Sequence, residues 1–378
     1  MDMKEIREKI DALDDTIKAA FEERMTLCAD MAAYKKENDL PIFYPARERE
    51  IIARLTKDMD AGMATYTKVL YNTLFEVSRS YQTKRIYDGG KLSAMICEAE
   101  KNTAHDLPTT CTVACQGTEG ANSQLAAEKL FSIPSIMFMG SFEGVFNAVA
   151  KGFCRYGILP ISNNLHGSVT EVYDLMKKHK FYIVKSIKLR VDHVLVAKKG
   201  AKLENIKEIF SHPQAIGQCS AFLSSLGNVK VTECTNTAVA AKMVADSGRD
   251  DIAAICNPSC AALYGLSELK SGIADSDNNY TRFICISKEP EIYPGANKTS
   301  IMFTLPHSPG SLFSIIAKFA ALGVNFSKIE SRPIPGKDFE YMFYLDFDAS
   351  LHADGLLETL DLFDAEYDGS FLGCYSEI

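Results

Sequence analysis

The stretch FEERMTLCADMAAYKK, residues 21–36, places an arginine in the apolar seam of a long helical pattern. Apolar or small side chains recur at spacings of three and four from Ile6 to Tyr34, which is the period of a helix with one buried face. The pattern predicts one helix over residues 4–38, and Arg24 occupies a position in its seam. Because a guanidinium is always charged, a seam that buries Arg24 calls for an anionic partner.

Composition sets the class of protein. The chain has 378 residues, which predicts two or three domains, and its net charge of −8 argues against binding to nucleic acid or to an anionic membrane. The N-terminus is charged from its second residue and no apolar run approaches the ~18 residues of a membrane span, so we expect neither a signal peptide nor a membrane segment.

Eleven cysteines stand mostly in apolar or strand-like settings. Cys111 and Cys115, like Cys256 and Cys260, are four residues apart and have no neighbouring histidine, so we expect no metal site. Without a secretory signal, the thiols are typical of a reduced, cytoplasmic protein.

Two further helices follow the long one. Pro45 suits a first helical position, so we expect a helix over 46–61 and another over 64–86. Two shorter helices cannot cover a helix some 50 Å long at ~1.5 Å per residue. The uncovered seam predicts an intertwined homodimer or a higher homo-oligomer.

The hydrophobic period changes after a partly helical linker. Strand and helix patterns alternate over residues 110–290, which predicts an α/β region. The last part restarts as strand, helix, two strands, helix and strand, and that order is ferredoxin-like.

The charged positions of the helical region can share one site. Lys35 follows Arg24 by eleven residues, about three turns, so both point the same way, whereas Arg7 lies roughly 100° around the helix and would have to come from a partner chain. A salt-bridged, solvated face is the alternative explanation for each charge alone. Together the candidates form a pocket suited to a small polyanion: Arg7, Arg24, Lys35, Arg47, Glu48, Ser78 and Gln82.

IREKIDALDDTIKAAFEERMTLCADMAAYKK, followed by RERE and SRSYQ, resembles an all-helical chorismate mutase over residues 1–86. The resemblance implies that three arginines, Arg7 from the partner among them, with Ser78 bind the substrate. It implies that Lys35 and Gln82 donate to the breaking ether oxygen and that Glu48 takes the ring hydroxyl. Tyr44 stands where that family usually has an aspartate.

The strongest signal in the α/β region is NNYTRFICIS, with Thr281 and Arg282 at the mouth of an apolar strand. A cation beside a hydroxyl suggests an anion-binding cleft, and an edge-strand salt bridge is the alternative. Asn163, Ser211 and Gln218 occupy loop-like positions that could line such a cleft.

TRF, SHPQAIGQC, TNTAVAAK and LYGL together resemble a prephenate dehydratase over residues 110–290. The resemblance implies two lobes like a periplasmic binding protein, with prephenate between them. Thr281 would assist departure of the ring hydroxyl, Arg282 would bind a carboxylate, and Thr237 would line the pocket with the residues above. The chain departs from that family's pattern at Asn122, Ser162, Asn164 and Asn257–Ser259.

PHSPGSLFSIIAKFAALGVNFSKIESRPIP resembles a phenylalanine-responsive ACT domain. A purely structural dimerisation module is the alternative. The resemblance implies that the regulator is bound by two short motifs, Gly310, Ser311 and Leu312 in one and Glu330, Ser331, Arg332 and Pro333 in the other.

The sequence therefore predicts a multidomain, cofactor-free enzyme. We expect an all-α mutase domain (1–88), a linker (89–108), a two-lobed α/β dehydratase domain (109–290) and a ferredoxin-like α+β ACT domain (298–378). Chorismate would become prephenate, and prephenate would become phenylpyruvate. Phenylalanine would inhibit the dehydratase more than the mutase, because the mutase lies beyond a linker. The alternative is a monofunctional mutase with a degenerate, ligand-sensing dehydratase-like region.

Overall fold

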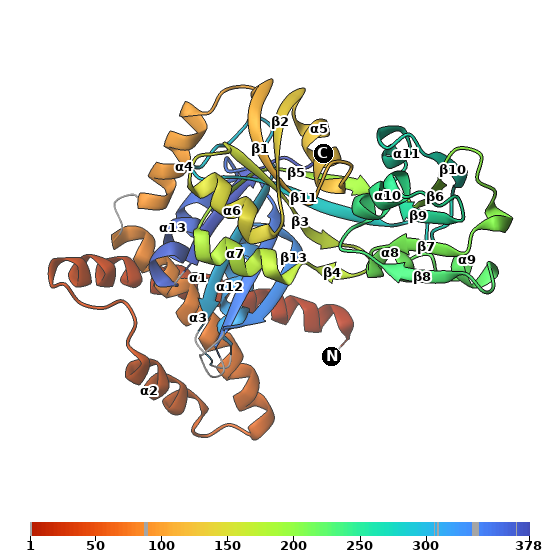
Figure 1. Ribbon diagram of the computed structural model, residues 1–378. Helices are drawn as coiled ribbons and strands as arrows, with labels where there is room; N and C mark the ends of the chain where they lie inside the picture. The colour runs from red at the N-terminus through yellow and green to blue at the C-terminus, as the bar shows by residue number, and fades with distance from the viewer. Residues whose placement is uncertain (1, 87–89, 306, 308–309, 335–339, 368) are drawn as a thin grey trace. The chain divides into compact units, whose positions relative to one another are not determined.

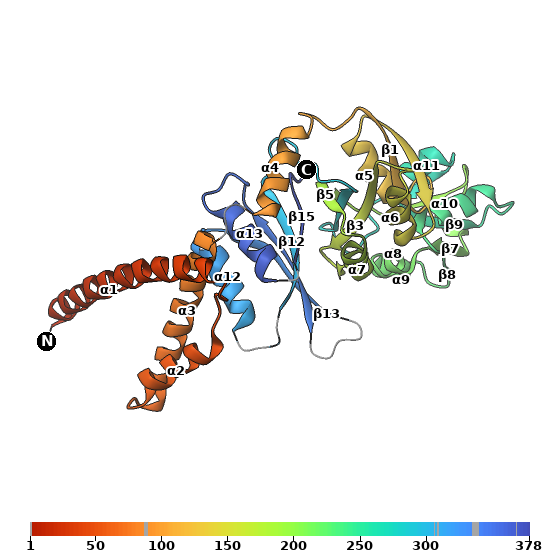
Figure 2. The ribbon, with the colours of Figure 1, turned by 90° about the vertical axis from the view of Figure 1, so that its left-hand side faces the viewer.

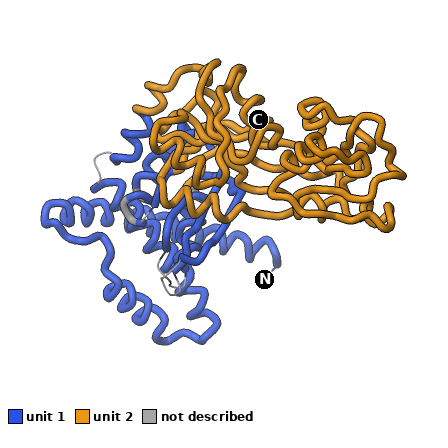
Figure 3. Tube along the Cα trace, viewed as in Figure 1, with its two compact units in different colours: residues 1–97, 302–371 blue, residues 98–301, 372–378 orange. Residues whose placement is uncertain are grey.

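The computed structural model describes all residues except 1, 87–89, 306, 308–309, 335–339 and 368. The chain divides into two compact units, Met1–Cys97 with Met302–Phe371 and Glu98–Ile301 with Leu372–Ile378 (Figure 3). Each unit therefore combines segments that are far apart in the sequence.

The first unit begins with three helices, α1 (Met3–Glu37), α2 (Pro45–Thr56) and α3 (Ala61–Ile86). Asp2 starts α1 by accepting a hydrogen bond from the Glu5 backbone N–H at 2.8 Å, within a capping box. Pro45 is the first residue of α2, as its fixed φ favours. The N-terminal helical region is confirmed.

Helix α1 is longer than its neighbours can cover. Its 35 residues span about 52 Å, and its N-terminal half extends away from α2 and α3 (Figure 2). Residues 2–20 are all exposed in the single chain. Exposed apolar side chains follow its seam: Ile6, Ile10, Leu13, Ile17, Leu27, Met31 and Tyr34.

The linker contains helix α4 (Lys91–Asn102). The Asp361 carboxylate accepts hydrogen bonds from the backbone N–H of Ser93 at 2.9 Å and of Gly90 at 3.2 Å, and so caps the start of α4. Asp361 belongs to helix α13 (Leu356–Glu366), and α13 and helix α12 (Ser311–Ala321) also contact α3. Within the first unit, the C-terminal module therefore packs directly against the helical region.

The second unit holds two lobes (Figure 1). The sheet of the first lobe has the strand order β2-β1-β3-β11-β5, with β4 paired to β3. Its strands are β1 (Thr110–Gln116), β2 (Ile133–Met139), β3 (Tyr156–Asn163), β4 (Gly167–Ser168), β5 (Tyr182–Arg190) and β11 (Tyr280–Ser287). Its helices are α5 (Asn122–Leu130), α6 (Phe142–Ala150) and α7 (Thr170–His179).

The second lobe has a five-stranded sheet in the order β10-β6-β9-β7-β8. Its strands are β6 (Val194–Ala197), β7 (Glu208–Ser211), β8 (Lys230–Glu233), β9 (Ile252–Cys256) and β10 (Ser267–Lys270). Its helices are α8 (Pro213–Gly217), α9 (Ser220–Ser225), α10 (Thr237–Asp246), α11 (Ser259–Leu263) and a 3₁₀ turn (Leu203–Asn205). The chain crosses between lobes twice, from β5 to β6 and from β10 to β11.

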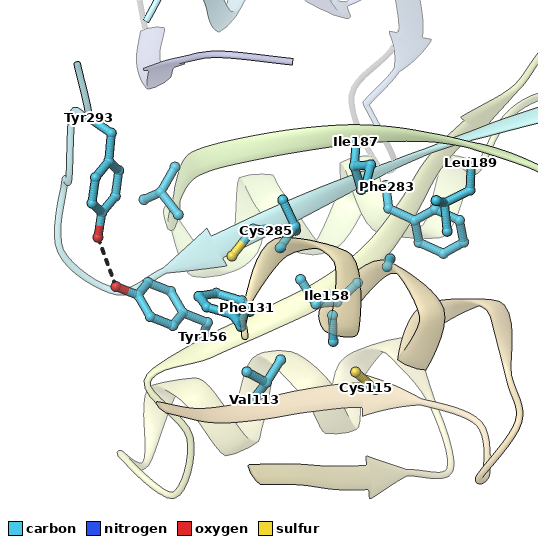
Figure 4. Packing of buried hydrophobic residues seen from close by; sticks show 14 residues of the cluster. Val113, Cys115, Phe131, Tyr156, Ile158, Ile187, Leu189, Phe283, Cys285 and Tyr293 are labelled. Carbon is cyan, nitrogen blue, oxygen red and sulfur yellow. Dashed lines mark hydrogen bonds between the residues drawn. The ribbon is translucent and has the colours of Figure 1, made fainter. Parts of the chain in front are cut away.

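Each lobe has its own apolar core. In the first lobe, buried side chains of β1, β3, β5 and β11 pack beneath α5, and the Tyr156 hydroxyl lies 3.0 Å from that of Tyr293 (Figure 4). In the second, alanines of α10 lie directly on β9. Two separate cores make each lobe a rigid support for the space between them.

The C-terminal module has the expected βαββαβ order, with strands in the order β13-β14-β12-β15. Its strands are β12 (Lys298–Leu305), β13 (Asn325–Pro333), β14 (Tyr341–Asp348) and β15 (Gly369–Tyr375). The last three residues then pair with β5: Ser376 O accepts from Ser186 N at 3.1 Å, and Ile378 O accepts from Lys188 N at 2.8 Å. The chain end thus extends the sheet of the first dehydratase-like lobe.

Candidate functional site

The helical region brings four of its candidate residues together in pairs. The Arg24 guanidinium on α1 donates to the Ser78 hydroxyl on α3. Eleven residues further along α1, Lys35 Nζ donates to Gln82 Oε1 at 2.9 Å. The two pairs lie on the contact between α1 and α3, so the helix period that selected them also placed them on one face.

Lys35 is buried with its partner. Its side chain is 7% exposed and that of Gln82 is 5% exposed, and Nζ also donates to the Ile42 carbonyl at 2.7 Å. Burial lowers the pKa of Lys35, an effect that Cys28 and Glu48 oppose. The Tyr44 ring, at the position where the sequence departs from the mutase pattern, lies 5.3 Å from Nζ.

Arg79 is a site residue that the sequence analysis missed. Its guanidinium pairs with the carboxylates of Glu48 on α2 and Glu76 on α3, and it stacks 4.7 Å from the Phe43 ring. Although burial opposes it, these carboxylates raise the pKa of Arg79. The signal was present in SRSYQ, because Arg79 follows Ser78 directly and lies three residues after Glu76.

Two predicted arginines lie outside this group within the single chain. Arg47 is exposed and pairs with Glu50 at 3.1 Å. Arg7 is exposed and precedes Arg24 by seventeen residues of α1, about 25 Å at ~1.5 Å per residue. The single chain therefore assembles Arg24, Ser78, Lys35, Gln82 and Glu48 but not Arg7 or Arg47.

A cavity of about 380 Å³ lies between the two lobes of the second unit. Four predicted residues line it, Asn163, Gln218, Thr237 and Thr281. The other polar lining residues are Gln116, Asn122, Ser123, His193, His212, Gln214, Thr235 and Asn236.

The lining residues include no lysine, arginine, aspartate or glutamate. Burial lowers the pKa of His193 and of His212, which favours their neutral forms. The sequence folds so that two helices begin at the cavity, α5 at Asn122 and α10 at Thr237, where Asn236 caps the first turn. Helix N-termini carry partial positive charge and unpaired N–H groups, so a neutral lining can still bind an anion.

Thr281 sits in a network of amide side chains. Asn163 Nδ2 donates to Thr281 Oγ1 at 2.9 Å and to Asn279 Oδ1 at 2.8 Å. Asn279 Nδ2 donates to Gln218 Oε1 at 3.1 Å, which lies 2.7 Å from His193 Nε2. The sequence analysis missed Asn279 and His193, although NNYTRF contains Asn279 two residues before Thr281.

Arg282 and Ser211 do not line the cavity. Successive side chains of a strand point to opposite faces, so Arg282 lies on the face of β11 opposite to Thr281, where its guanidinium donates to the Tyr375 hydroxyl at 2.7 Å. Ser211 is fully buried and donates to the Ile255 carbonyl at 2.7 Å, joining β7 to β9. In the structure, the described partners of both side chains are groups of the protein itself.

Several departures from the dehydratase pattern meet between the lobes. Asn257 Nδ2 donates to the Gly120 carbonyl at 2.6 Å and lies 3.4 Å from Asn122 Oδ1. Asn164 Oδ1 accepts from the Tyr280 N–H at 2.7 Å. Each asparagine therefore has protein partners in the described chain.

The candidate regulator residues lie in the C-terminal module of the first unit. Gly310, with φ of 90°, precedes α12, and Ser311 and Leu312 begin it. Glu330 to Pro333 form the end of β13. Because α12 leads back to the start of β13, both motifs lie at the same end of the module.

Within the described residues, no helix is long and apolar enough to cross a membrane, and no cluster of histidine, cysteine, aspartate or glutamate could hold a metal ion.

These features define a two-lobed α/β protein with a ligand cleft, joined to a helical region with a buried lysine–amide pair. The family model for prephenate dehydratase matches residues 113–291, and that for type II chorismate mutase matches residues 6–83. The chain belongs to the prephenate dehydratase family and carries a chorismate mutase region ahead of it.

Among curated relatives, an arogenate dehydratase/prephenate dehydratase of Arabidopsis thaliana is 37% identical, over 72% of this chain and 74% of its own. The bifunctional chorismate mutase/prephenate dehydratase of Escherichia coli K12 is 29% identical, over 98% of this chain and 95% of its own. The crystal structure of prephenate dehydratase from Arthrobacter aurescens in complex with L-Phe superposes with a TM-score of 0.64 at 29% identity, covering 70% of this chain and 89% of that one.

Proposed function

We propose that the chain is a bifunctional enzyme of phenylalanine biosynthesis, which rearranges chorismate to prephenate and converts prephenate to phenylpyruvate. The observation that carries this proposal is the presence of two separate sites of matching chemistry. Buried Lys35 and Gln82 lie in the helical unit, and Thr281 lies in the cavity of the other unit. The similarity to the Escherichia coli enzyme over 98% of the chain supports the same pairing.

The mutase reaction needs positioning and charge stabilisation rather than a proton donor or nucleophile. Arg24 would hold a chorismate carboxylate, and Lys35 and Gln82 would donate to the ether oxygen as negative charge grows on it. A millionfold acceleration corresponds to ~8 kcal/mol, and one preorganised donor of this kind contributes ~3–4 kcal/mol. Two donors and the selection of a compact substrate conformer are sufficient.

Glu48 keeps its assigned place beside the ring hydroxyl in this proposal, with one addition. Its carboxylate pairs with Arg79, which orients it as a hydrogen-bond acceptor. Arg79 therefore acts as the positioning residue for Glu48.

A second chain would complete the mutase site. The exposed seam of α1 offers apolar side chains over residues 2–20, which a partner helix would bury. In such a homodimer the partner's α1 would deliver its Arg7 to the carboxylates. Arg47 would reach the same substrate by exchanging its exposed partner Glu50 for a carboxylate.

In the dehydratase reaction, loss of CO₂ from the ring carbon leaves an electron pair that aromatises the ring and expels the hydroxide on the opposite carbon. That hydroxide leaves as water if it receives a proton. Thr281 Oγ1 already accepts a hydrogen bond from Asn163, so its own O–H can donate a hydrogen bond to the leaving hydroxyl and stabilise the charge that grows on it. The proton that converts the hydroxide to water comes from solvent, so Thr281 keeps its own.

The neutral lining supports prephenate as the substrate. The pyruvyl carboxylate would bind at the starts of α5 and α10, whose N–H groups and dipoles replace the cation expected from Arg282. Arogenate carries an ammonium in place of the keto oxygen of prephenate. The lining residues include no carboxylate to pair with that ammonium, so prephenate fits better.

Phenylalanine would act as the feedback inhibitor through the C-terminal module, which we assign as an ACT domain with Gly310–Leu312 and Glu330–Pro333 as the sensor. The related Arthrobacter aurescens structure contains L-Phe, which supports this ligand. None of the eleven cysteines forms a disulfide within the described residues, and we place the enzyme in the cytoplasm.

Separate assays of the purified protein test the proposal. Chorismate should give prephenate, and supplied prephenate should give phenylpyruvate, with arogenate turned over more slowly. The variant Thr281→Val should lose phenylpyruvate formation and keep mutase activity. Mutase activity without any turnover of prephenate or arogenate would favour the alternative, a monofunctional mutase with a ligand-sensing dehydratase-like region.

A further inference from the structure

We propose that Asn279 and His193, one on each crossover between the lobes, are positioning residues that set the direction of a hydrogen-bond chain ending at Thr281 and Gln218. Asn279 directly precedes β11 and His193 directly precedes β6. The inference rests on the proposed dehydratase function for its consequence, but the chain of bonds is a property of the resting protein.

The direction of the chain is fixed at one end by the backbone. Asn163 Oδ1 accepts from the backbone N–H of Leu165 at 2.9 Å and of His166 at 3.0 Å. Backbone N–H groups can only donate, so the amide of Asn163 cannot flip without losing both bonds. Its Nδ2 must therefore face Thr281 and Asn279 as a donor.

Each following side chain inherits its orientation. Asn279 accepts from Asn163 through Oδ1, so its Nδ2 is the atom that donates to Gln218 Oε1. Because Gln218 presents its oxygen, His193 Nε2 at 2.7 Å must carry a proton and donate to it. The chain thus predicts the Nε2–H tautomer for a neutral His193.

The surroundings of His193 agree with that tautomer. The ring is 5% exposed, and its Nδ1 is buried without a hydrogen-bond partner among the described residues. Proteins leave buried N–H groups without a partner less often than buried acceptors. An unprotonated Nδ1 is therefore the favoured state.

The consequence lies at the two ends of the chain. Thr281 receives a hydrogen bond on its oxygen, and Gln218 receives two on its oxygen. Both side chains are left with donors, the Thr281 O–H and the Gln218 NH₂, and both line the cavity. The hydrogen-bond chain therefore leaves two donors in the cavity, where they can bind a carboxylate of the substrate and the departing hydroxide.

The hydrogen-bond chain also connects the two lobes. Asn163 and Thr281 belong to the first lobe, and Gln218 ends α8 in the second. The two crossovers are tied together by the Val191 N–H, which donates to the Asn279 carbonyl at 2.8 Å. Asn279 and His193 are therefore placed to fix the position of the Thr281 donor in the first lobe relative to the Gln218 donor in the second.

The first test reads the tautomer of His193 by ¹⁵N NMR in the full chain. In the wild type, Nε2 should be protonated and Nδ1 unprotonated. Asn279→Asp replaces the donor that faces Gln218 Oε1 by a carboxylate oxygen, so Gln218 should turn and the His193 tautomer should reverse. His179, a histidine of the same lobe pair that stacks on Phe146, should keep its signals and serves as the internal control.

The second test uses substitution at His193 with two readouts. His193→Gln keeps an N–H donor near the Nε2 position and should retain kcat/KM for prephenate within about threefold. His193→Leu keeps the volume without the donor and should lose at least tenfold, about 1.4 kcal/mol. The thermal midpoint of the second unit, which contains His193, should stay close to the wild-type value in both variants and reports an intact fold there. Mutase activity should be unchanged in both.

A wild-type His193 in the Nδ1–H tautomer, or equal activities for the glutamine and leucine variants, would overturn the inference. If the wild type turns over neither prephenate nor arogenate, the proposed function fails, and the NMR result still decides whether the hydrogen-bond chain exists.

Discussion

The Nε atom of Arg282 lies 2.7 Å from a carboxylate oxygen of Glu377, the penultimate residue of the chain. Lys188 on β5 approaches the same carboxylate at 2.7 Å. Burial alone would raise the pKa of Glu377, but Lys188 and Arg282 lower it below its usual range. The strand that presents Thr281 to the cavity is therefore held on its other face by the end of the chain.

Removing this carboxylate should destabilise the second unit. Glu377→Gln removes a carboxylate that pairs with the guanidinium of Arg282, which is 9% exposed, and breaking such a buried pair costs about 3 kcal/mol. We expect a lower thermal midpoint and reduced turnover of prephenate. Glu143→Gln breaks the exposed pair with Lys178 and is the matched control, with a much smaller expected shift. Equal shifts for the two variants would contradict a structural role for Glu377.

The same contacts affect how the sensor can be tested. Deleting the residues after 297 removes Glu377 together with Tyr375, whose hydroxyl contacts Arg282. A truncated protein would therefore lose dehydratase activity for a structural reason. Point variants in the sensor are the cleaner experiment.

Substitution of either mutase donor should leave the dehydratase activity intact. Lys35→Ala or Gln82→Ala removes one side of the buried 2.9 Å hydrogen bond and one donor to the ether oxygen, so prephenate formation should fall about 10²- to 10³-fold. Phenylpyruvate formation from supplied prephenate should stay near the wild-type rate. Loss of both activities in a folded protein would show that the two sites are not independent.

The helical period of the sequence located part of the mutase site, whereas residue type in the α/β region did not separate cavity-lining residues from their neighbours. The 3.6-residue period placed Arg24 and Lys35 on one face of α1 correctly. The alternation of a strand shows that Thr281 and Arg282 cannot both face one cavity, a constraint that the composition of TRF alone does not reveal. Residue type selected both residues, and the fold shows that Thr281 lines the cavity whereas Arg282 does not.

Long-range contacts account for the remaining misses. Arg79 pairs with Glu48 across 31 positions, and His193 meets Gln218 across 25, so these two contacts have no local signature. Only the pair of Arg79 with Glu76 is local. Asn122 and Asn257 are separate departures from the dehydratase pattern, yet they lie 3.4 Å apart between the lobes. Only the fold shows that they belong to one contact.

Subunit exchange tests the proposed dimer of the mutase region. Arg7→Ala and Lys35→Ala should each be inactive as mutases, and a mixture should regain part of the activity. If Arg7 comes from the partner chain, one of the two sites in a mixed dimer contains both native residues. The measurement is prephenate formation after exchange has been verified with tagged chains. No recovery in verified mixed dimers would place Arg7 in the site of its own chain.

Stability should fall as the solution is acidified below the usual histidine pKa. Burial lowers the pKa of His179, His193 and His212 below their ordinary value of 6.5. Below pH 6.5 the unfolded chain binds protons that the folded chain does not, so the free energy of unfolding decreases with falling pH and is regained above it. Thermal unfolding between pH 7.5 and 5.5, about one unit on either side of the ordinary histidine pKa, measures how steeply the free energy of unfolding depends on pH. His193→Gln should flatten it, and an unchanged slope would mean that His193 does not contribute.

Phenylalanine inhibition should depend on the start of α12. Gly310 has φ of 90°, a conformation that side chains with a Cβ disfavour, and it precedes the helix whose N–H groups would take the amino acid's carboxylate. Gly310→Val should therefore raise the phenylalanine concentration needed for half-inhibition of the dehydratase by at least tenfold. Phenylalanine can inhibit only if it binds two states of the enzyme with different affinities. A variant that loses only the binding site should therefore keep its dehydratase activity nearly unchanged in the absence of phenylalanine.

Gly323, at the other end of α12, is the matched control. Its φ is 69° and a Cβ there would meet no atom within 4 Å, as at Gly310, so Gly323→Val imposes a similar backbone strain away from the sensor. It should leave inhibition unchanged. Since α12 and α13 contact α3, we also expect phenylalanine to lower mutase activity, though less than dehydratase activity. Desensitisation by both glycine variants would mean that strain in α12, rather than loss of a binding site, abolishes the response.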